Sequence, residues 1–245
     1  MSEKPYPLAV RMKEYEFEET EEKFNDDLPL ICRVDGRSFS KFCKQYEKPY
    51  SDIISSVMKE TACFLLKETK ADLSYHQSDE ISLLFNPVEF PKQRMFNGSK
   101  TKLISVISGL TSAFFMKSLI EISNKNEQTI GSSIPHFDSR MFSVPNMTEA
   151  GNYFVWRQQD AKRNSISMYA QSIFSHKLLQ NKSGKEMLKM IEESGHDYNS
   201  MPFNFKYGSF FMKESVEKEI DGNKCIRTEV KEYDIDTITY RLLNK

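Results

Sequence analysis

The 245-residue chain is predicted to adopt an α+β fold built on an antiparallel sheet, and three observations lead to this prediction. Short segments with the two-residue period of a strand are interspersed with longer segments of helical period. Their order is strand, helix, strand, strand, helix, strand. The two central strands are separated by only a few residues, so they are expected to pair as an antiparallel hairpin.

The first helices and the first strand lie in the first third of the chain. Residues 12–24 are rich in Glu with three interspersed aromatic side chains, which is typical of a solvated helix with a narrow apolar stripe. Residues 30–34 have the alternation of a strand, which the pair Asp35-Gly36 must interrupt. Residues 51–69 place apolar side chains at helical spacing, so a helix is expected to follow the first strand.

The remaining elements of this first region complete the order. A hairpin is predicted at residues 73–85 with Asp79 and Glu80 at its tip, a long helix at residues 99–122, and a strand at residues 137–144. This is the split βαβ or ferredoxin-like arrangement, in which the helices cover one face of the sheet. It is also the pattern of a polymerase palm or a nucleotide cyclase, and it places the end of the first strand beside the hairpin turn.

The composition changes after Pro145, which suggests two units. We expect residues 1–145 to form a palm-like catalytic core with an N-terminal helix, and residues 146–245 to form a C-terminal α/β extension, a helical and hairpin subdomain packed on the palm. The extension begins with a basic helix at residues 149–174. A second helix at residues 183–193 opens with a Ser-x-x-Glu capping box, and a hairpin is expected around Asp221-Gly222.

Composition restricts the setting in which the protein works. The 34 Lys and Arg nearly balance the 35 Asp and Glu, so any nucleic-acid surface must be local. The four cysteines have no CxxC spacing and no nearby His, which favours free thiols in a reducing compartment over structural zinc. The longest apolar stretch, residues 103–115, is interrupted by small polar residues, so neither a membrane span nor a signal peptide is predicted. We therefore expect a cytoplasmic protein.

Asp35 and Asp79 are the candidate metal ligands. Two carboxylates about 4 Å apart repel each other by roughly 4 kcal/mol at an effective dielectric constant near 20, so a cation or a proton must offset the repulsion. Mg²⁺ fits this need, because proteins hold it with one or two carboxylates completed by water and substrate phosphates. The alternative is that both segments are ordinary turns, in which Asp and Gly are common.

Four blocks of the sequence resemble motifs of a known family, that of tRNA-histidine guanylyltransferase and the guanylyltransferase-like proteins that add nucleotides to tRNA in the 3′-to-5′ direction. The blocks are Arg33-Val34-Asp35-Gly36-Arg37-x-Phe39, Gln77-Ser78-Asp79-Glu80, Phe137-Asp138-Ser139-Arg140 and Tyr153-x-x-Trp156-Arg157-Gln158-x-Asp160. Lys102 stands where a family lysine approaches the triphosphate. The blocks agree with the family in order and spacing and span most of the chain.

The resemblance implies a template-dependent nucleotidyltransferase that acts on the 5′ end of tRNA by two-metal phosphoryl transfer. Two Mg²⁺ ions would be bound by Asp35, Asp79 and the carbonyl of Gly36, and the catalytic residues would be Asp35, Asp79 and Glu80. The nucleotide, ATP or GTP, would be bound by Arg33, Asp35, Gly36, Arg37, Ser38, Phe39, Ser40, Ser78, Asp79 and Lys102. The resemblance also implies a homotetramer.

The chain departs from the family pattern after the fourth block. Guanylyltransferases proper read His-x-Asn-Asn-Leu-Tyr-Asn there, whereas this chain reads Lys162-Arg163-Asn164-Ser165-Ile166-Ser167-Met168 and keeps only the first Asn. In the family this segment is associated with recognition of histidine tRNA, so the resemblance favours the broader repair of tRNA 5′ ends. The candidate tRNA-binding residues are Arg157, Lys162, Arg163 and Asn164.

Three alternatives stay open at this point. The chain could be a tRNA(His) guanylyltransferase proper, or a palm-fold nucleotide cyclase-type enzyme that uses the same two carboxylates on a nucleotide alone. It could also be a non-catalytic RNA-binding subunit that keeps the fold. The basic helix after Pro145 argues against the cyclase, because a cyclase has no RNA to bind.

Overall fold

A computed structural model describes residues 7–20, 22–89, 91–125, 130, 133–220 and 223–243. Within these residues six strands form one sheet in the order β4-β1-β3-β2-β5-β6, and every neighbouring pair is antiparallel. The strands are β1 (Leu30–Gly36), β2 (Leu73–Gln77), β3 (Glu80–Phe85), β4 (Phe137–Ser143), β5 (Ser209–Ile220) and β6 (Asn223–Tyr233). The predicted α+β fold with an antiparallel sheet is confirmed.

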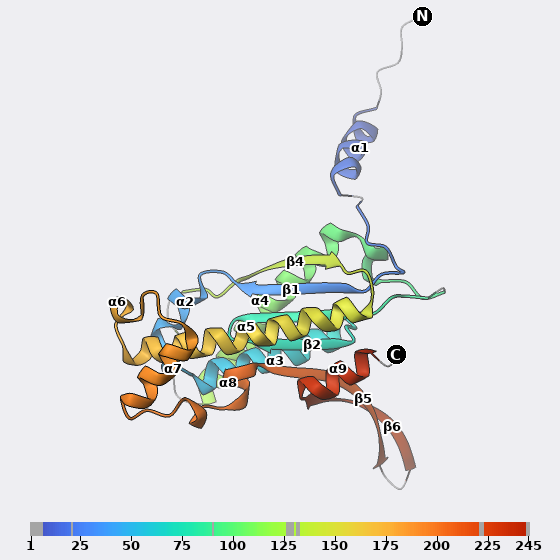
Figure 1. Cartoon of the computed structure of the whole chain (residues 1–245). Coiled ribbons are helices and arrows are strands. Elements are labelled where there is room, and N and C mark those ends of the chain that lie inside the picture. Colours follow the sequence, from blue (N-terminus) through green and yellow to red (C-terminus); the bar gives the residue numbers. More distant parts are fainter. Residues whose placement is uncertain are drawn as a thin grey trace, which may run out of the picture.

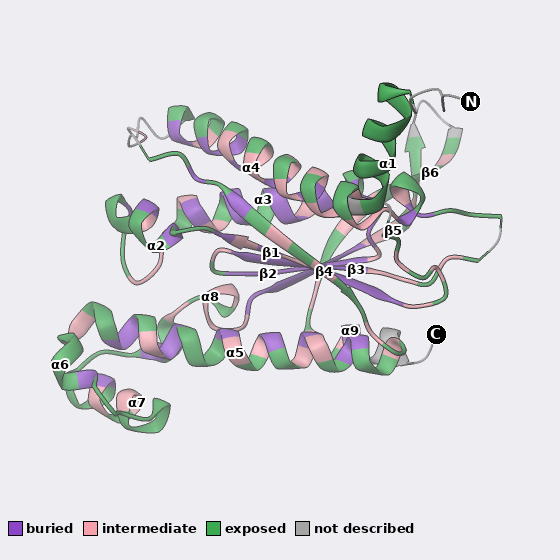
Figure 2. Ribbon diagram, turned by 90° about the horizontal axis from the view of Figure 1, so that it is seen from above, coloured by how far each residue is buried: buried purple, intermediate pink, exposed green. Residues whose placement is uncertain are grey.

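The helices divide between the two faces of the sheet (Figure 2). Those of the described ranges are α1 (Leu8–Thr20), α2 (Phe39–Phe42), α3 (Asp52–Glu68), α4 (Lys100–Lys125), α5 (Met147–Ile173), α6 (His176–Leu179), α7 (Gly184–Glu193), α8 (Phe203–Tyr207) and α9 (Ile235–Leu243). The two palm helices, α3 and α4, lie together on one face, as predicted. The extension covers the other face with α5 and α9.

Each face of the central strands has its own apolar cluster, because side chains alternate along a strand. Cys32 and Val34 of β1 pack with α3 and α4 in a cluster that also holds Phe115. Ile31 of β1 packs on the opposite face with Phe154 of α5. Since successive side chains point to opposite faces, Asp35 lies on the same face as Ile31, the face covered by α5.

The extension completes the sheet. β5 pairs with β2, and β5 and β6 form a long hairpin that projects beyond the body of the molecule (Figure 1). The predicted turn at Asp221-Gly222 lies outside the described residues, but the strands on both sides of it confirm a hairpin there. α9 then returns to pack against α5.

Side chains cap the helices where the sequence indicates. Ser51 accepts a hydrogen bond from the backbone N–H of Ile54 at the start of α3. Ser183 and Glu186 form the predicted capping box of α7. The first helix begins and ends earlier than predicted, because the residues after it leave the helix to bond with the segment before α4: the N–H of Phe24 donates to the carbonyl of Gly98 over 3.0 Å.

The length and apolar composition of α4 would allow it to cross a membrane, a test that the core helices of soluble proteins also pass. In the fold α4 packs along α3 and the edge strand β4. Leu103, Ile107, Phe115 and Leu119 are buried along this contact. α4 therefore serves as a core helix of the palm.

Gly208 is required by the junction between α8 and β5. Its φ of 74° and ψ of −173° fall in a region that only glycine occupies readily. An added Cβ would lie 2.5 Å from the carbonyl oxygen of His76 and 2.6 Å from the ring of Tyr75. We predict that Gly208→Ala lowers the free energy of unfolding by more than ~3 kcal/mol, through overlap added to backbone strain.

Gly195 provides the matched control, because it has a φ of 81° but no atom within 4 Å of an added Cβ. Gly195→Ala should cost only the backbone strain, ~1 kcal/mol. Urea unfolding of both variants measures the difference. Equal losses of unfolding free energy in the two variants would contradict the close approach of Gly208 to β2.

Candidate functional site

The end of β1 and the β2–β3 turn meet at one edge of the sheet. Asp35 is the cross-strand partner of Glu80, and the backbone N–H of Gly36 donates to the carbonyl of Asp79 over 3.1 Å. Ser78 takes a left-handed conformation, with φ of 50°, which closes the turn tightly. The two carboxylates that the sequence singled out, Asp35 and Asp79, therefore lie beside each other.

The electrostatics of Asp79 reflect this pairing. Burial, with the charge of Asp35, raises the pKa of the Asp79 carboxyl to about 6, while a hydrogen bond from Ser78 opposes the rise. In the described part of the chain, neither Asp35 nor Asp79 has a Lys or Arg within ion-pair distance. The two acids thus form a pair of like charges with no protein cation to balance it.

Glu80, one residue further on, is in the opposite situation. Arg157 of α5 donates to it twice, from Nε to Oε1 over 2.8 Å and from a terminal nitrogen to Oε2 over 2.7 Å. Both side chains are buried, and Arg33 lies 3.9 Å away on β1. Burial raises the pKa of the Glu80 carboxyl, and the Arg157 guanidinium opposes that rise. Glu80 therefore ties α5 to the sheet directly below the two acids.

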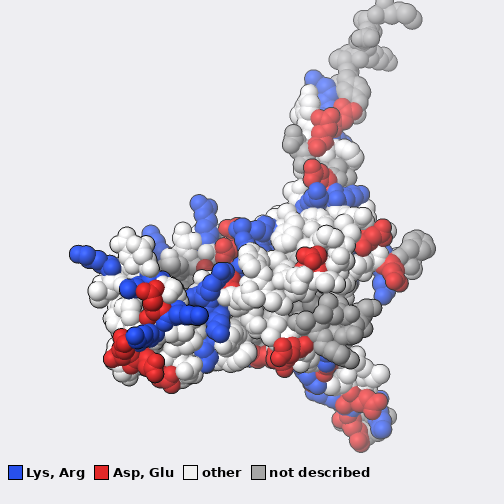
Figure 3. Space-filling view, viewed as in Figure 1, with Lys and Arg blue, Asp and Glu red and all other residues white. Residues whose placement is uncertain are grey.

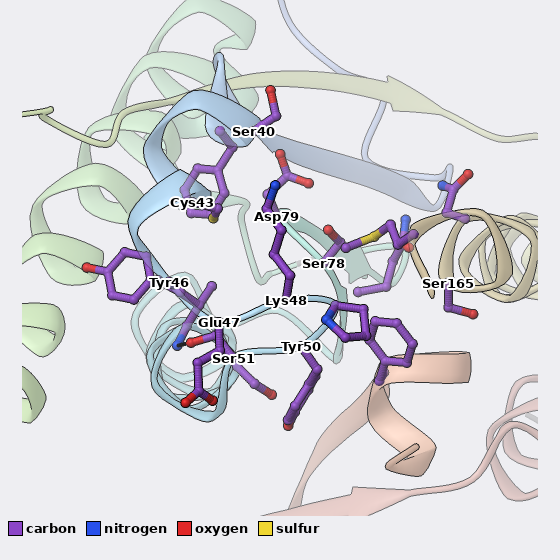
Figure 4. Close-up of a pocket in the computed structure, with 18 of the residues that line it drawn as sticks. Ser40, Cys43, Tyr46, Glu47, Lys48, Tyr50, Ser51, Ser78, Asp79 and Ser165 are labelled. Atoms are coloured by element: carbon purple, nitrogen blue, oxygen red, sulfur yellow. Dashed lines mark hydrogen bonds between the residues drawn. The ribbon is translucent and has the colours of Figure 1, made fainter. Parts of the chain in front are cut away.

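A cavity of about 410 Å³ adjoins Asp79, within the size range of small-molecule sites (Figure 4). One wall is the segment after α2, including Tyr46 and Tyr50, and the others come from the start of α3, the end of β2, α5 and α8. A smaller cleft, lined by Asp35, Glu80 and Arg157, shares Ser78 and Asp79 with the cavity. The two hollows form one site around the carboxylates.

Polar groups are fixed inside the cavity. The side-chain amide of Asn204 donates to the hydroxyl oxygens of Tyr50, over 3.1 Å, and of Ser55, over 2.8 Å. The ring of Phe205 meets Tyr50 edge to face at 5.7 Å. Sequence reasoning did not find these residues, because α8 is far from the motifs along the chain. The sequence did offer one signal for this wall: Tyr46 and Tyr50 lie around Pro49 in a loop that follows the Asp-Gly motif.

Three of the predicted nucleotide-binding residues lie where β1 passes into α2: Gly36 ends β1, and Phe39 and Ser40 begin α2. Phe39 is buried among Phe42, Phe115 and Phe137 and also lines the cavity. A Cβ on Gly36 would come within 2.5 Å of the Phe39 ring, so this position needs glycine. Ser40 is exposed and borders the cavity in Figure 4.

The predicted cationic contacts lie farther from the cavity. Arg37 and Ser38 are exposed, and the backbone N–H of Arg37 donates to the carbonyl of His136 over 3.0 Å. Arg33 points toward Glu80 on the α5 face. Lys102 is exposed in the first turn of α4 and lines neither the cavity nor the cleft.

The predicted RNA-binding residues of α5 have different surroundings. Arg157 is buried against Glu80, so it presents no free guanidinium to a phosphate. Lys162 is exposed with its Nζ 5.5 Å from the Tyr207 ring centre. Arg163 pairs with Asp160 at the surface, and Asn164 borders both hollows. In Figure 3 cations gather over the half of the molecule that holds the C-terminal part of α5, α6 and α7.

Among the described residues, no group of three or more His, Cys, Asp or Glu side chains is arranged to hold a metal ion. The carboxylate pair alone is therefore the candidate metal position. This donor set still suits Mg²⁺, which commonly takes one or two protein carboxylates and fills its other positions with water and phosphate oxygens.

Comparison with known proteins gives a consistent result. Residues 9–145 match the family described as "Thg1: tRNAHis guanylyltransferase". An uncharacterised protein of Acanthamoeba polyphaga mimivirus is 29% identical over 94% of this chain and 85% of its own length. The tRNA(His) guanylyltransferase of Schizosaccharomyces pombe is 27% identical over 84% of this chain and 82% of its own.

Solved structures extend the likeness to nearly the whole fold. A bacterial tRNA(His) guanylyltransferase (Thg1)-like protein in complex with ATP superposes with a TM-score of 0.77 and 32% identity, covering 90% of this chain and 92% of that one. A bacterial Thg1-like protein in complex with GTP gives a TM-score of 0.77 and 30% identity, covering 96% and 95%.

The raised pKa of Asp79 predicts a pH-dependent stability. Its folded-state pKa, about 6, lies above the unfolded value near 3.9, so the stability that this carboxyl contributes is complete below pH ~4 and is lost as pH rises through 6. Asp79→Asn removes this titration. The unfolding free energy of the variant minus that of the wild type should therefore increase by roughly 2 kcal/mol between pH 4 and pH 8.

Urea unfolding across this pH range tests the prediction. Asp138→Asn is the control, because Asp138 lies on the same face beside Asp35 but is exposed and pairs with Arg140. A difference between Asp79→Asn and the wild type that stays constant with pH would mean that the pKa of Asp79 is not raised in the folded protein.

The Glu80–Arg157 pair predicts a large stability loss on breaking it. Arg157→Met leaves the Glu80 carboxylate buried without its cation, so the free energy of unfolding should fall by ~3–5 kcal/mol. Arg163→Met removes an arginine from the same helix whose side chain is 69% exposed, and should cost less than ~1 kcal/mol. Chemical denaturation compares the two, and similar small losses would contradict a buried ion pair.

Proposed function

The chain belongs to the Thg1 family of tRNAHis guanylyltransferases and is a nucleotidyltransferase, and we propose that it repairs or extends the 5′ end of tRNA in the 3′-to-5′ direction. The observation that carries this proposal is the pair Asp35 and Asp79, unbalanced by any described Lys or Arg, in a cleft that adjoins a cavity of small-molecule size. A like-charged pair that destabilises the protein is more easily explained by a bound cation and phosphate than by a structural role.

The cavity is the proposed site of the nucleoside triphosphate. Two bacterial Thg1-like proteins of similar fold were solved in complex with ATP and with GTP. In this chain the aromatic walls at Tyr46, Tyr50 and Phe205 would enclose the base and ribose. The triphosphate would then extend past Ser78 to the carboxylates, with Ser40 and backbone N–H groups of the turn after β1 near its oxygens.

Asp35, Asp79 and the carbonyl of Gly36 are the proposed ligands of Mg²⁺, with two ions when the triphosphate is bound. Bound Mg²⁺ would neutralise the triphosphate and lower the pKa of the attacking hydroxyl. Glu80 is not needed as a ligand, because Arg157 already occupies both of its oxygens. Its proposed part is to hold α5 against the sheet and so keep the cleft at a fixed width.

The chain's own residues couple cation binding to a proton. With a pKa of about 6, a fraction of Asp79 holds a proton near neutral pH. A ligating carboxylate must be deprotonated, so cation binding would release that proton and would weaken as pH falls below 6. No side chain in the described cleft is required as general base, and His76 is a poor one: burial lowers its pKa to about 4, and its ring stacks on Phe211.

The substrate is proposed to be the 5′ end of tRNA in general. The exposed Lys162 and Arg163 replace the start of the family segment associated with histidine tRNA, and they are suited to phosphates of any sequence. Selection of each added nucleotide would come from pairing with the opposite RNA strand. Addition of guanylate to histidine tRNA is the second candidate, favoured by the named activity of the S. pombe relative.

We also propose a homotetramer in the cytoplasm. α1 projects from the body with its apolar residues Leu8, Tyr15 and Phe17 more than half exposed, a surface that suits contact with another copy (Figure 1). The four cysteines are all free thiols, as is usual in a reducing compartment.

Substitution of either acid should abolish turnover while leaving RNA binding intact. We predict that Asp35→Asn and Asp79→Asn each lower the rate of nucleotide addition at least a hundredfold, roughly the scale of lost metal-centred charge stabilisation. The assay combines the protein, Mg²⁺ and the four nucleoside triphosphates with labelled tRNA lacking its first 5′ nucleotide. Asp52→Asn, at the exposed start of α3, is the control.

Parallel reactions separate the candidates. Full-length histidine tRNA as substrate measures guanylate addition, and nucleoside triphosphates without RNA reveal cyclic products. Unchanged addition in both variants would refute the role of the two carboxylates as metal ligands in catalysis. RNA binding without addition, in the wild type as well, would leave a binding subunit, whereas product from nucleotide alone would point to a cyclase.

A further inference from the structure

A group of three aromatic side chains, two of them exposed, lies toward the β4 edge of the sheet, whereas the cavity lies toward β2. Trp156 of α5 is 48% exposed and Phe142 of the edge strand β4 is 37% exposed. Tyr153 joins them, with ring centres 5.8 Å from Trp156 and 5.7 Å from Phe142. With the exposed cations Arg140 and Arg163, these three aromatic residues form what we call the Trp156 ledge.

The Trp156 ledge is connected to the catalytic cleft at two points. Asp138 is the cross-strand partner of Asp35 on β4, and Arg140, two residues along, points to the same face of the sheet. On α5, the guanidinium of Arg157 lies 4.6 Å from the centre of the Trp156 ring while it pairs with Glu80. The ledge therefore adjoins the cleft from the β4 side, whereas the cavity adjoins it from the β2 side.

The ledge offers one face-supported aromatic ring with two exposed cations near it. Arg157 is fixed by Glu80 and Asp160, so the Trp156 ring stands on a rigid support. Nearly half of the Trp156 side chain still faces solvent. Arg163 lies two turns further along the same flank of α5 and Arg140 lies on β4, with 69% and 53% of their side chains exposed.

We propose that the Trp156 ledge receives the base-paired 5′ end of the RNA, with its terminal base pair stacked on Trp156 and the adjoining phosphates near Arg140 and Arg163. This inference rests on the proposed function. An enzyme that joins a nucleotide to an RNA end must bring two substrates to the same carboxylates, and the cavity holds only one of them. A terminal base pair offers the planar face that an aromatic side chain binds without regard to sequence.

The experiment uses the fact that Trp156 is the only tryptophan in the chain. Its fluorescence is followed as tRNA lacking the first 5′ nucleotide is added to the wild-type protein. Stacking should quench the emission in step with RNA binding. A single-stranded RNA of the same 5′ sequence, without a paired end, should quench much less at equal occupancy.

Kinetics of nucleotide addition supply the second measurement. Trp156→Leu should raise the KM for the RNA roughly tenfold, as expected for loss of one stacking contact, while kcat and the KM for the nucleotide stay as in the wild type. Trp156→Phe keeps a smaller ring, so its KM for the RNA should lie between the values of the wild type and of Trp156→Leu. Leu178→Ser, at an apolar side chain of α6 that is 58% exposed and outside both hollows, is the matched control.

The outcomes separate this inference from the function on which it rests. Nucleotide addition with no quenching and an unchanged KM for the RNA in Trp156→Leu would overturn the binding of RNA at the ledge. The proposed function would stand. Equal quenching by single-stranded RNA would overturn the paired end as its occupant. Quenching by the paired end without any nucleotide addition would support the ledge and count against the proposed function.

Discussion

The hydrogen bond from the N–H of Gly36 to the carbonyl of Asp79 is the constraint on which the site depends. It closes the β1–β3 ladder at its last rung, so two acids from distant parts of the chain are held beside each other although they repel. Gly36 is needed there because a side chain would strike Phe39, and Phe39 is fixed by three other rings. The core of the palm thus sets the position of the charged edge.

The neighbouring carboxylates of Asp79 and Glu80 have different roles at that edge of the sheet. Glu80 has two hydrogen bonds from Arg157 and is buried, which makes it a structural anchor for α5. Asp79, one residue earlier, has no such partner among the described residues and carries a raised pKa. The reversal of side-chain direction between adjacent residues therefore separates an acid that stabilises the fold from one that is available to ligands.

Much of the fold could be predicted from the sequence, because its signals are local. Alternation located β1, helical spacing located α3 and α4, and the capping box located α7. The pairing of β5 with β2 could not be predicted, since strand pairing joins residues far apart in the chain. The same limit applies to the cavity wall at Asn204. Arg157 was assigned to RNA because a basic helix position shows its charge but not its burial partner.

The placement of α5 has a consequence for how little of the chain can stand alone. The family match ends at residue 145, just before α5, yet Ile31, Leu84 and Tyr75 of the palm strands are buried in a cluster with side chains of the segments that follow. A fragment that ends at that boundary would expose an apolar face of the sheet to water. It would also lack the wall of the catalytic cleft that α5 provides. The smallest fragment that folds and catalyses is consequently longer than the region that the family match covers, and shortening the chain from the C-terminus should yield aggregates before it yields a minimal enzyme.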